Sequence, residues 1–222
     1  MTENLSFNNA DQKLEGISAL LQAQTSFERL PMLEIILDRF SRSFASELRS
    51  STSDAISTDV HSISSMRFQD YINEVQSGSL TCIFKIKELE SLALIILDRA
   101  FLDSMTNILM GGWRLNKPIK SQDRSFTVIE RKVAAYLVEM IFVNLSSAFS
   151  LVYNLTFQIE RFELNSKFAT IVQPADAVAL MQIKVDIDKT GGMMEIVLPY
   201  NSLESISDSL KKVFMGDNVK NL

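Results

Sequence analysis

The sequence is poor in the residues on which many enzymes and metal sites rely. Its 222 residues include one cysteine (Cys82), one histidine (His61) and seven glycines. A single cysteine excludes an intrachain disulfide, and a Cys/His zinc site needs about four such ligands. A histidine-dependent nucleophile would have to use His61 alone, and few glycines are left for a phosphate-binding loop. We therefore expect no cofactor and no metal, and the composition favours a protein that binds partners over an enzyme.

An excess of positive charge and a long purely apolar run are also missing. Twenty-two Lys and Arg residues stand against 27 Asp and Glu, a net charge of −5. A nucleic-acid groove needs clustered cations to neutralise phosphates, so we expect no nucleic-acid partner. The N-terminus lacks the basic flank and apolar core of a secretory signal. The longest uncharged window, residues 140–159, contains seven polar residues, too many for a lipid-spanning helix. The sequence thus predicts a soluble, cytoplasmic protein without a transmembrane segment.

The first half of the chain shows alternating helical and strand periodicities. Apolar residues at three- and four-residue steps predict a helix, and period-two alternation predicts a strand. Gly111 and Gly112 are a typical helix end because glycine adopts left-handed backbone angles cheaply. In chain order, the predicted elements are a helix from Pro31, strands at 60–68, 80–86 and 92–97, and a helix at 101–109.

The second half repeats this order. Thr127 and Glu130 form a capping-box pattern that opens a long helix. The elements that follow are strands at 155–159, 179–187 and 193–198, a turn at Lys189–Gly192, and a closing helix at 203–214. The first helices of the halves begin about 96 residues apart, a spacing too long for a solenoid repeat. We predict an α/β (α+β) domain in which two α-β-β-β-α units, related by a pseudo-two-fold axis, form one sheet flanked by helices.

Isolated polar residues are best explained as structural. Cys82 shares a strand face with apolar residues and is expected to be buried, while His61 is expected to be a structural or surface residue. Asp186 and Asp188 lie on one strand face without further ligands nearby in sequence, which favours a solvated face over a metal site.

Two segments have both a structural and a partner-binding interpretation. Gly111-Gly112-Trp113-Arg114 is either a helix end with its linker or an interaction loop, because Trp and Arg are enriched where protein surfaces bind. An amphipathic patch within residues 14–21 is either a flanking helix or a partner-binding peptide.

Three local sequences occur in a distinctive order: LPMLEIILDRF at 30–40, Met110-Gly111-Gly112, and RSFTVIERKV at 124–133. In this order and spacing they resemble the middle domain of the FliM family of bacterial flagellar motor switch proteins. The resemblance covers residues 28–215, with 1–27 as an N-terminal extension and 216–222 as a tail. It implies the pseudo-symmetric α/β/α fold that the family shares with CheC-type phosphatases.

The resemblance implies a non-enzymatic role in the cytoplasmic ring of the rotor, at the basal body on the cytoplasmic face of the inner membrane. In that family, neighbouring FliM copies stand side by side, carry FliG and control the direction of rotation. A Gly-Gly-x-Gly loop takes part in the FliG contact. Gly111 and Gly112 match it, whereas Arg114 replaces its last glycine, so the FliG-facing loop is expected at Gly111, Gly112, Trp113 and Arg114.

The relation to CheC leaves an alternative, a CheC-like phosphatase or adaptor that acts on phosphorylated CheY. Such phosphatases present a Glu and an Asn three residues later on a helix. Here Glu34 is followed by Leu37, and Glu139 by Phe142, and an apolar side chain cannot orient an attacking water. The sequence therefore favours the scaffold over the phosphatase.

Two further parts of the family pattern are weak or missing. FliM proteins begin with a short segment that captures phosphorylated CheY, and residues 15–21 match it loosely. The residues proposed for this role are Glu15, Ile17, Ala19, Leu20 and Leu21. The family also ends in a FliN-like domain, whereas this sequence stops at Leu222, so a FliN contact is not inferred.

Overall fold

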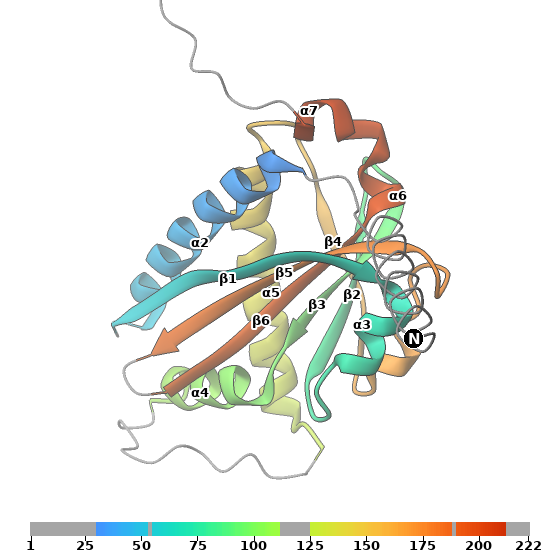
Figure 1. Cartoon of the computed structure of the whole chain (residues 1–222). Coiled ribbons are helices and arrows are strands. Elements are labelled where there is room, and N and C mark those ends of the chain that lie inside the picture. Colours follow the sequence, from blue (N-terminus) through green and yellow to red (C-terminus); the bar gives the residue numbers. More distant parts are fainter. Residues whose placement is uncertain (1–29, 53–54, 112–124, 188–189, 212–222) are drawn as a thin grey trace, which may run out of the picture.

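A computed structural model describes residues 30–52, 55–111, 125–187 and 190–211. Within these residues a single six-stranded antiparallel sheet, in the order β1-β5-β6-β3-β2-β4, is flanked by helices (Figure 1). This arrangement confirms the predicted mixed fold with one sheet. The strands are β1 (Ile56–Arg67), β2 (Leu80–Ile86), β3 (Ser91–Leu97), β4 (Phe157–Glu163), β5 (Ala177–Ile187) and β6 (Thr190–Pro199).

The two longest helices, both of 22 residues, follow the predicted starts closely. The helices are α2 (Pro31–Thr52), α3 (Phe68–Glu74), α4 (Arg99–Leu109), α5 (Val128–Phe149), α6 (Tyr200–Leu203) and α7 (Ser207–Lys211). Short 3-10 turns occupy Ser166–Phe168 and Glu204–Ile206.

The strand order carries the predicted internal symmetry. From either edge, the sheet presents the first strand of one half and then the second and third strands of the other: β1-β5-β6 and β4-β2-β3. The symmetry axis therefore passes between β6 and β3, and each half completes the other's sheet. Glu47 of α2 and Asn144 of α5, 97 positions apart, meet where the Asn144 amide donates a hydrogen bond to the Glu47 carboxylate. Equivalent positions of the two long helices thus contact each other.

Strand alternation divides the interior into two cores on opposite faces of the sheet. Phe84 belongs to the larger core beneath α2, α4 and α5, where its ring lies 5.2 Å from that of Phe142. Its neighbour Ile83 belongs to the smaller core beside α3. The β3 strand is buried on both faces, which explains why its sequence is an uninterrupted apolar run.

Helix α5 is, among the described helices, the one long and apolar enough to cross a membrane by length and composition. However, 61% of its most apolar window is buried inside the protein. The buried apolar residues of α5 pack in the larger core, which explains why this helix is so apolar.

The predicted turn at Lys189–Gly192 was placed too late. Ile187 pairs with Thr190, so Gly191 and Gly192 lie within β6 and not in the connection. A Cβ atom at Gly192 would overlap the Asp98 carboxylate and lie 2.5 Å from the Phe101 nitrogen. Gly192 therefore lets the start of α4 approach the strand closely, a long-range requirement that local turn patterns do not reveal. A Cβ atom at Gly191 would instead overlap the Val185 carbonyl of the paired strand β5.

Three further boundaries differ from the prediction. The α3 helix was missed because seven residues are too few for a clear helical period. Leu155 is buried but precedes β4, which begins at Phe157. The closing helix is broken into α6, a 3-10 turn and α7 across the described residues up to Lys211.

We predict that Gly192→Ala destabilises the fold by about 2–3 kcal/mol, because the added methyl group must displace α4 from β6. The midpoint of urea unfolding measures the effect. Gly78→Asn is the matched control, since Gly78 has a φ of +87° and open space around its Cβ position. Equal midpoints for Gly192→Ala and the wild type would contradict the close approach.

Candidate functional site

One of the predicted partner-binding segments begins at Gly111, just after α4. Contacts at the start of α4 fix the position of this helix. Asp98 caps α4 by accepting hydrogen bonds from the Phe101 nitrogen at 2.6 Å and from the Met193 nitrogen at 2.7 Å. The second bond ties the helix to β6. Burial raises the pKa of the Asp98 carboxyl above its ordinary value, while the two N–H bonds oppose that shift.

A buried ion network then joins α4 to α5. The Arg99 guanidinium contacts the Asp103 carboxylate at 3.0 Å, one turn along α4, and the Glu130 carboxylate of α5 at 3.3 Å. All three side chains are less than 10% exposed. The guanidinium carbon also lies 4.4 Å from the centre of the Phe126 ring, a cation–π contact. Buried charges are stable only when paired, so this network fixes the two helices relative to each other.

Glu130 has a second role at the start of α5. Its carboxylate accepts a hydrogen bond from the Thr127 nitrogen at 2.7 Å, and the Thr127 hydroxyl accepts one from the Glu130 nitrogen at 3.2 Å. The predicted capping box is therefore present. The sequence motif that begins at Phe126 now has a physical explanation. The Phe126 ring lies against Arg99, Thr127 caps α5, Glu130 pairs with Arg99, and Val133 is buried in the core.

The α4 helix ends at Met110 and Gly111. The Gly111 nitrogen donates to the Ile108 carbonyl at 2.9 Å, and Gly111 has the left-handed φ of +73° that the helix-end prediction requires. Met110 is 63% exposed. Gly112, Trp113 and Arg114 lie outside the described residues, as do Glu15, Ile17, Ala19, Leu20 and Leu21. The structure thus describes both anchors of the 112–124 segment: the end of α4 and the start of α5.

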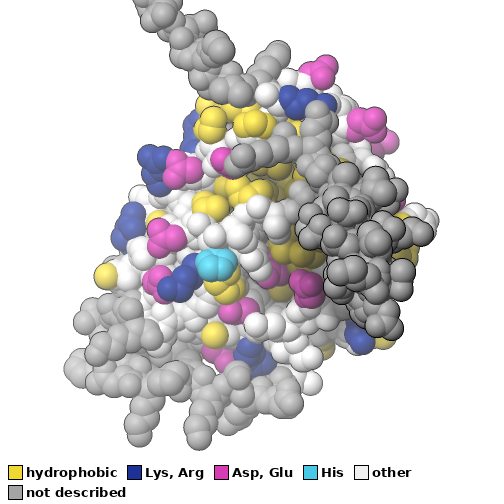
Figure 2. Space-filling view, viewed as in Figure 1, with side chains coloured by type: hydrophobic (Ala, Val, Ile, Leu, Met, Phe, Trp, Pro, Cys, Tyr) yellow, Lys and Arg dark blue, Asp and Glu magenta, His cyan; other side chains and the backbone are white. Residues whose placement is uncertain are grey.

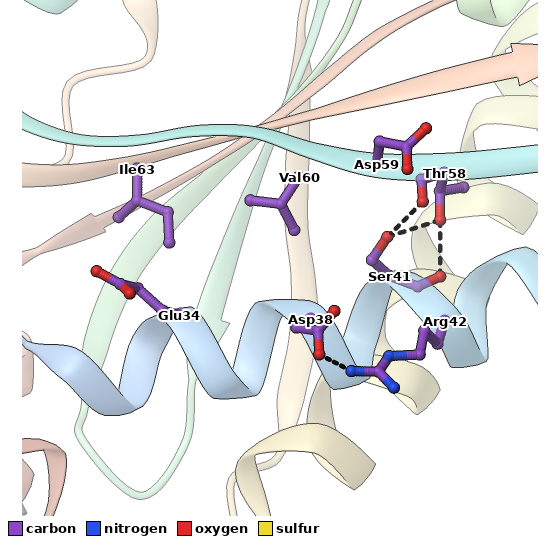
Figure 3. A pocket seen from close by; sticks show the side chains of 8 residues that line it. All are labelled: Glu34, Asp38, Ser41, Arg42, Thr58, Asp59, Val60 and Ile63. Atoms are coloured by element: carbon purple, nitrogen blue, oxygen red, sulfur yellow. Dashed lines mark hydrogen bonds and ion pairs between the residues drawn. The ribbon is translucent and has the colours of Figure 1, made fainter. Parts of the chain in front are cut away.

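A groove of about 560 Å³ separates α2 from the edge strand β1 (Figure 3). The Ser41 hydroxyl closes one end by donating to the Thr58 carbonyl at 2.8 Å, and the two elements diverge toward Glu34 and Ile63. The lining residues are Glu34, Asp38, Ser41, Arg42, Thr58, Asp59, Val60 and Ile63. Arg42 pairs with Asp38. The groove has no nucleophile with a base beside it and brings together none of the predicted partner-binding residues.

A smaller cavity of about 190 Å³ lies on the opposite face of the sheet. Within it, the Tyr71 hydroxyl and the Gln182 amide each donate to the Glu195 carboxylate at 2.7 Å. Burial, followed by the charge of Glu195, raises the pKa of Tyr71 well above its ordinary value. Tyr71 therefore stays protonated and serves as a hydrogen-bond donor, not as a base.

The remaining polar candidates have structural surroundings. Cys82 is fully buried, and burial raises its pKa to about 12, so the thiol is unreactive near neutral pH. His61 is exposed on β1. Asp186 pairs with Lys184 at 2.9 Å, and the described residues contain no group of three or more potential metal ligands. The face in Figure 2 carries acidic and basic side chains interspersed with one another.

The two Glu positions considered for phosphatase chemistry are each followed, three residues later, by a buried apolar residue. Glu34 and Glu139 are exposed, but Leu37 and Phe142, three residues after them, point into the core and are at most 5% exposed. Among the described residues, no helix therefore presents a Glu with an Asn three residues later to a phosphorylated partner.

Sequence reasoning missed Arg99 and Asp103. The available signal was their four-residue spacing on a helix face that is otherwise apolar, since such a pair is rarely buried without a further partner. Nothing local pointed to Glu130, 31 positions away, as that partner.

Comparisons with known proteins agree with this architecture. The family described as "Flagellar motor switch protein FliM" matches residues 26–215. The FliM protein of Caulobacter vibrioides is 36% identical over 96% of the chain, and that of Pseudomonas aeruginosa is 28% identical over 86%. The aligned regions cover 57% and 58% of these relatives, so the chain spans little more than half the length of the curated relatives it matches.

Solved structures show the same fold. The FliM middle domain of Vibrio alginolyticus superposes with a TM-score of 0.73 at 24% identity, covering 81% of this chain and 99% of the other. The Helicobacter pylori FliM in a FliG-FliM complex gives a TM-score of 0.74 at 22% identity, with coverages of 82% and 96%. Thermotoga maritima FliY gives 0.69 at 14% identity, with coverages of 84% and 100%.

Arg99→Met is predicted to lower the free energy of unfolding by about 3–5 kcal/mol, because it removes the guanidinium that pairs with two buried carboxylates. The triple variant Arg99→Met/Asp103→Leu/Glu130→Gln should recover part of that loss, since no buried charge is then unpaired. Urea titration of both variants measures the difference. A triple variant less stable than Arg99→Met would contradict this explanation.

Proposed function

The chain belongs to the FliM family of flagellar motor switch proteins, and we propose that it is a non-enzymatic part of the rotor's cytoplasmic ring. In this role it links FliG to chemotaxis signalling and controls the direction of rotation. It works at the basal body, on the cytoplasmic face of the inner membrane, beside neighbouring copies of itself. The observation that carries this proposal is the family match over residues 26–215 together with the shared middle-domain fold.

A rigid body is what such a role requires mechanically. Symmetric strand exchange between the two halves holds the sheet together, and apolar cores pack on both of its faces. Cores packed this densely transmit displacement instead of absorbing it. A signal that changes the packing between copies would therefore tilt the domain as a unit and alter its contact with FliG.

The FliG contact is proposed at Gly111, Gly112, Trp113 and Arg114. Three observations support this choice: the exposed apolar Met110 beside Gly111, the left-handed turn at Gly111, and the buried network that joins α4 to α5. A relative from H. pylori has been solved as a FliG-FliM complex, which supports FliG as the partner.

A scaffold is favoured over a CheC-like phosphatase by the buried positions of Leu37 and Phe142. The same domain, residues 28–215, is proposed to carry the N-terminal segment 1–27 as a tether. Within it, Glu15 and the apolar residues Ile17, Ala19, Leu20 and Leu21 form the proposed site for phosphorylated CheY.

Met110→Glu is predicted to weaken FliG binding at least about tenfold with the fold intact, because it places a charge on an exposed apolar contact. Isothermal titration with FliG measures the affinity, and thermal unfolding verifies the fold. Gly111→Val should also weaken binding by straining the left-handed turn, whereas Gly111→Asn, which tolerates that conformation, should bind more tightly than Gly111→Val.

The control for this titration is Leu164→Glu, which changes another exposed apolar residue elsewhere on the surface, 51% exposed against 63% for Met110. Full FliG affinity in folded Met110→Glu and Gly111→Val, or an equal loss in Leu164→Glu, would refute the assignment to the end of α4.

Deletion of residues 11–22 is predicted to lower the affinity for phosphorylated CheY and to leave FliG affinity unchanged. Fluorescence anisotropy with each partner separates the two effects. Unchanged CheY affinity would exclude the segment.

A further inference from the structure

The outward face of α5 is apolar where the surface of a soluble domain is usually polar. Val128, Tyr136 and Val143 are 64%, 48% and 65% exposed, although they lie on one of the two longest helices, which packs against the larger core. Successive 100° steps along the helix bring these three residues onto one stripe with Lys132, Ala135 and Glu139. Large apolar side chains that gather on one exposed face are typical of an interaction surface. The stripe therefore indicates a contact that the isolated chain does not supply.

The sequence of the stripe is complementary to itself when reversed. If two α5 helices lie antiparallel with Lys132 opposite Glu139 of the other copy, the remaining positions are fixed. Val128 then faces the partner's Val143, and Ala135 faces the partner's Tyr136. At the centre, the small Ala135 meets the large Tyr136. Lys132 and Glu139, on either side of the centre, form pairs of opposite charge, and Val128 and Val143 form apolar pairs at the two ends.

The charged residues of the stripe indicate which partner covers it. Opposite charges at Lys132 and Glu139 form two ion pairs in the antiparallel arrangement, whereas a membrane surface would leave Glu139 beside lipid without a partner. Both residues are exposed. The pattern therefore favours a second copy of this chain as the occupant.

We propose that the outer face of α5 joins two copies of the chain about a local two-fold axis, with their α5 helices antiparallel. Such a contact closes on itself and pairs copies, whereas a ring needs a head-to-tail contact. It is therefore an interaction in addition to the proposed ring, and it uses a surface distinct from the end of α4. One helix pair buries less area than a permanent dimer, so the association is concentration-dependent.

Sedimentation velocity of the full chain over an about hundredfold concentration range tests the contact. Lys132→Glu and Glu139→Lys should each weaken the dimer about tenfold, since each replaces two attractive pairs by two repulsive ones. An equimolar mixture of the two variants should associate as well as the wild type, because opposite charges again face each other. The double variant Lys132→Glu/Glu139→Lys should also recover.

Lys87→Glu, an exposed charge change on the β2–β3 turn, is the matched control and should dimerise normally. A wild type that is monomeric throughout, or a mixture no stronger than its components, would overturn the proposal. Co-sedimentation of monomers with anionic lipid vesicles, or dimerisation only after removal of residues 1–29, would assign the stripe to a membrane or to the chain's own N-terminal segment. Any of these results leaves FliG titration at α4 as a separate test of the proposed function.

Discussion

The buried guanidinium of Arg99 is the constraint on which the junction of α4 with α5 depends. It pairs with Asp103 on its own helix and with Glu130 on α5, and it lies against the Phe126 ring. An unpaired charge at this depth would cost several kcal/mol, so neither helix can move without the other. Because Arg99 begins α4 and Glu130 lies in the first turn of α5, the ion pair joins the two halves of the chain. It also holds the elements on either side of residues 112–124.

The duplicated fold explains why this junction needs a special device. Each half contributes its first strand beside the other half's strands, so the sheet itself is tied together by symmetric exchange. Glu47 and Asn144 join the long helices at equivalent positions. Within the part of the chain that the structure describes, the junction of α4 with α5 occurs once. The Arg99–Glu130 ion pair joins α4 to α5 at this junction, and Asp98 holds α4 to β6. These contacts fix the α4 helix, which the strand exchange within the sheet does not hold.

Local patterns predicted the elements well because each buries a face with a clear period. The capping box at Thr127 and Glu130 and the apolar run of β3 are local signals, and both occur as expected. The failures involve partners far away in sequence. Gly192 was assigned to a turn because its need for space comes from Asp98, and Arg99 was overlooked because its second carboxylate is on another helix. The end of α4 could be predicted from Gly111, but not the network that positions it.

Native-state hydrogen exchange in Glu130→Gln tests the central role of the ion pair most directly. Glutamine can still complete the capping box, so the substitution removes the charge pair and little else. The account predicts that the amides of Met110 and Gly111 exchange much faster than in the wild type, while those in the middle of α2, such as Phe44, change little. Unchanged exchange at Met110 and Gly111, or an equal acceleration in α2, would contradict it.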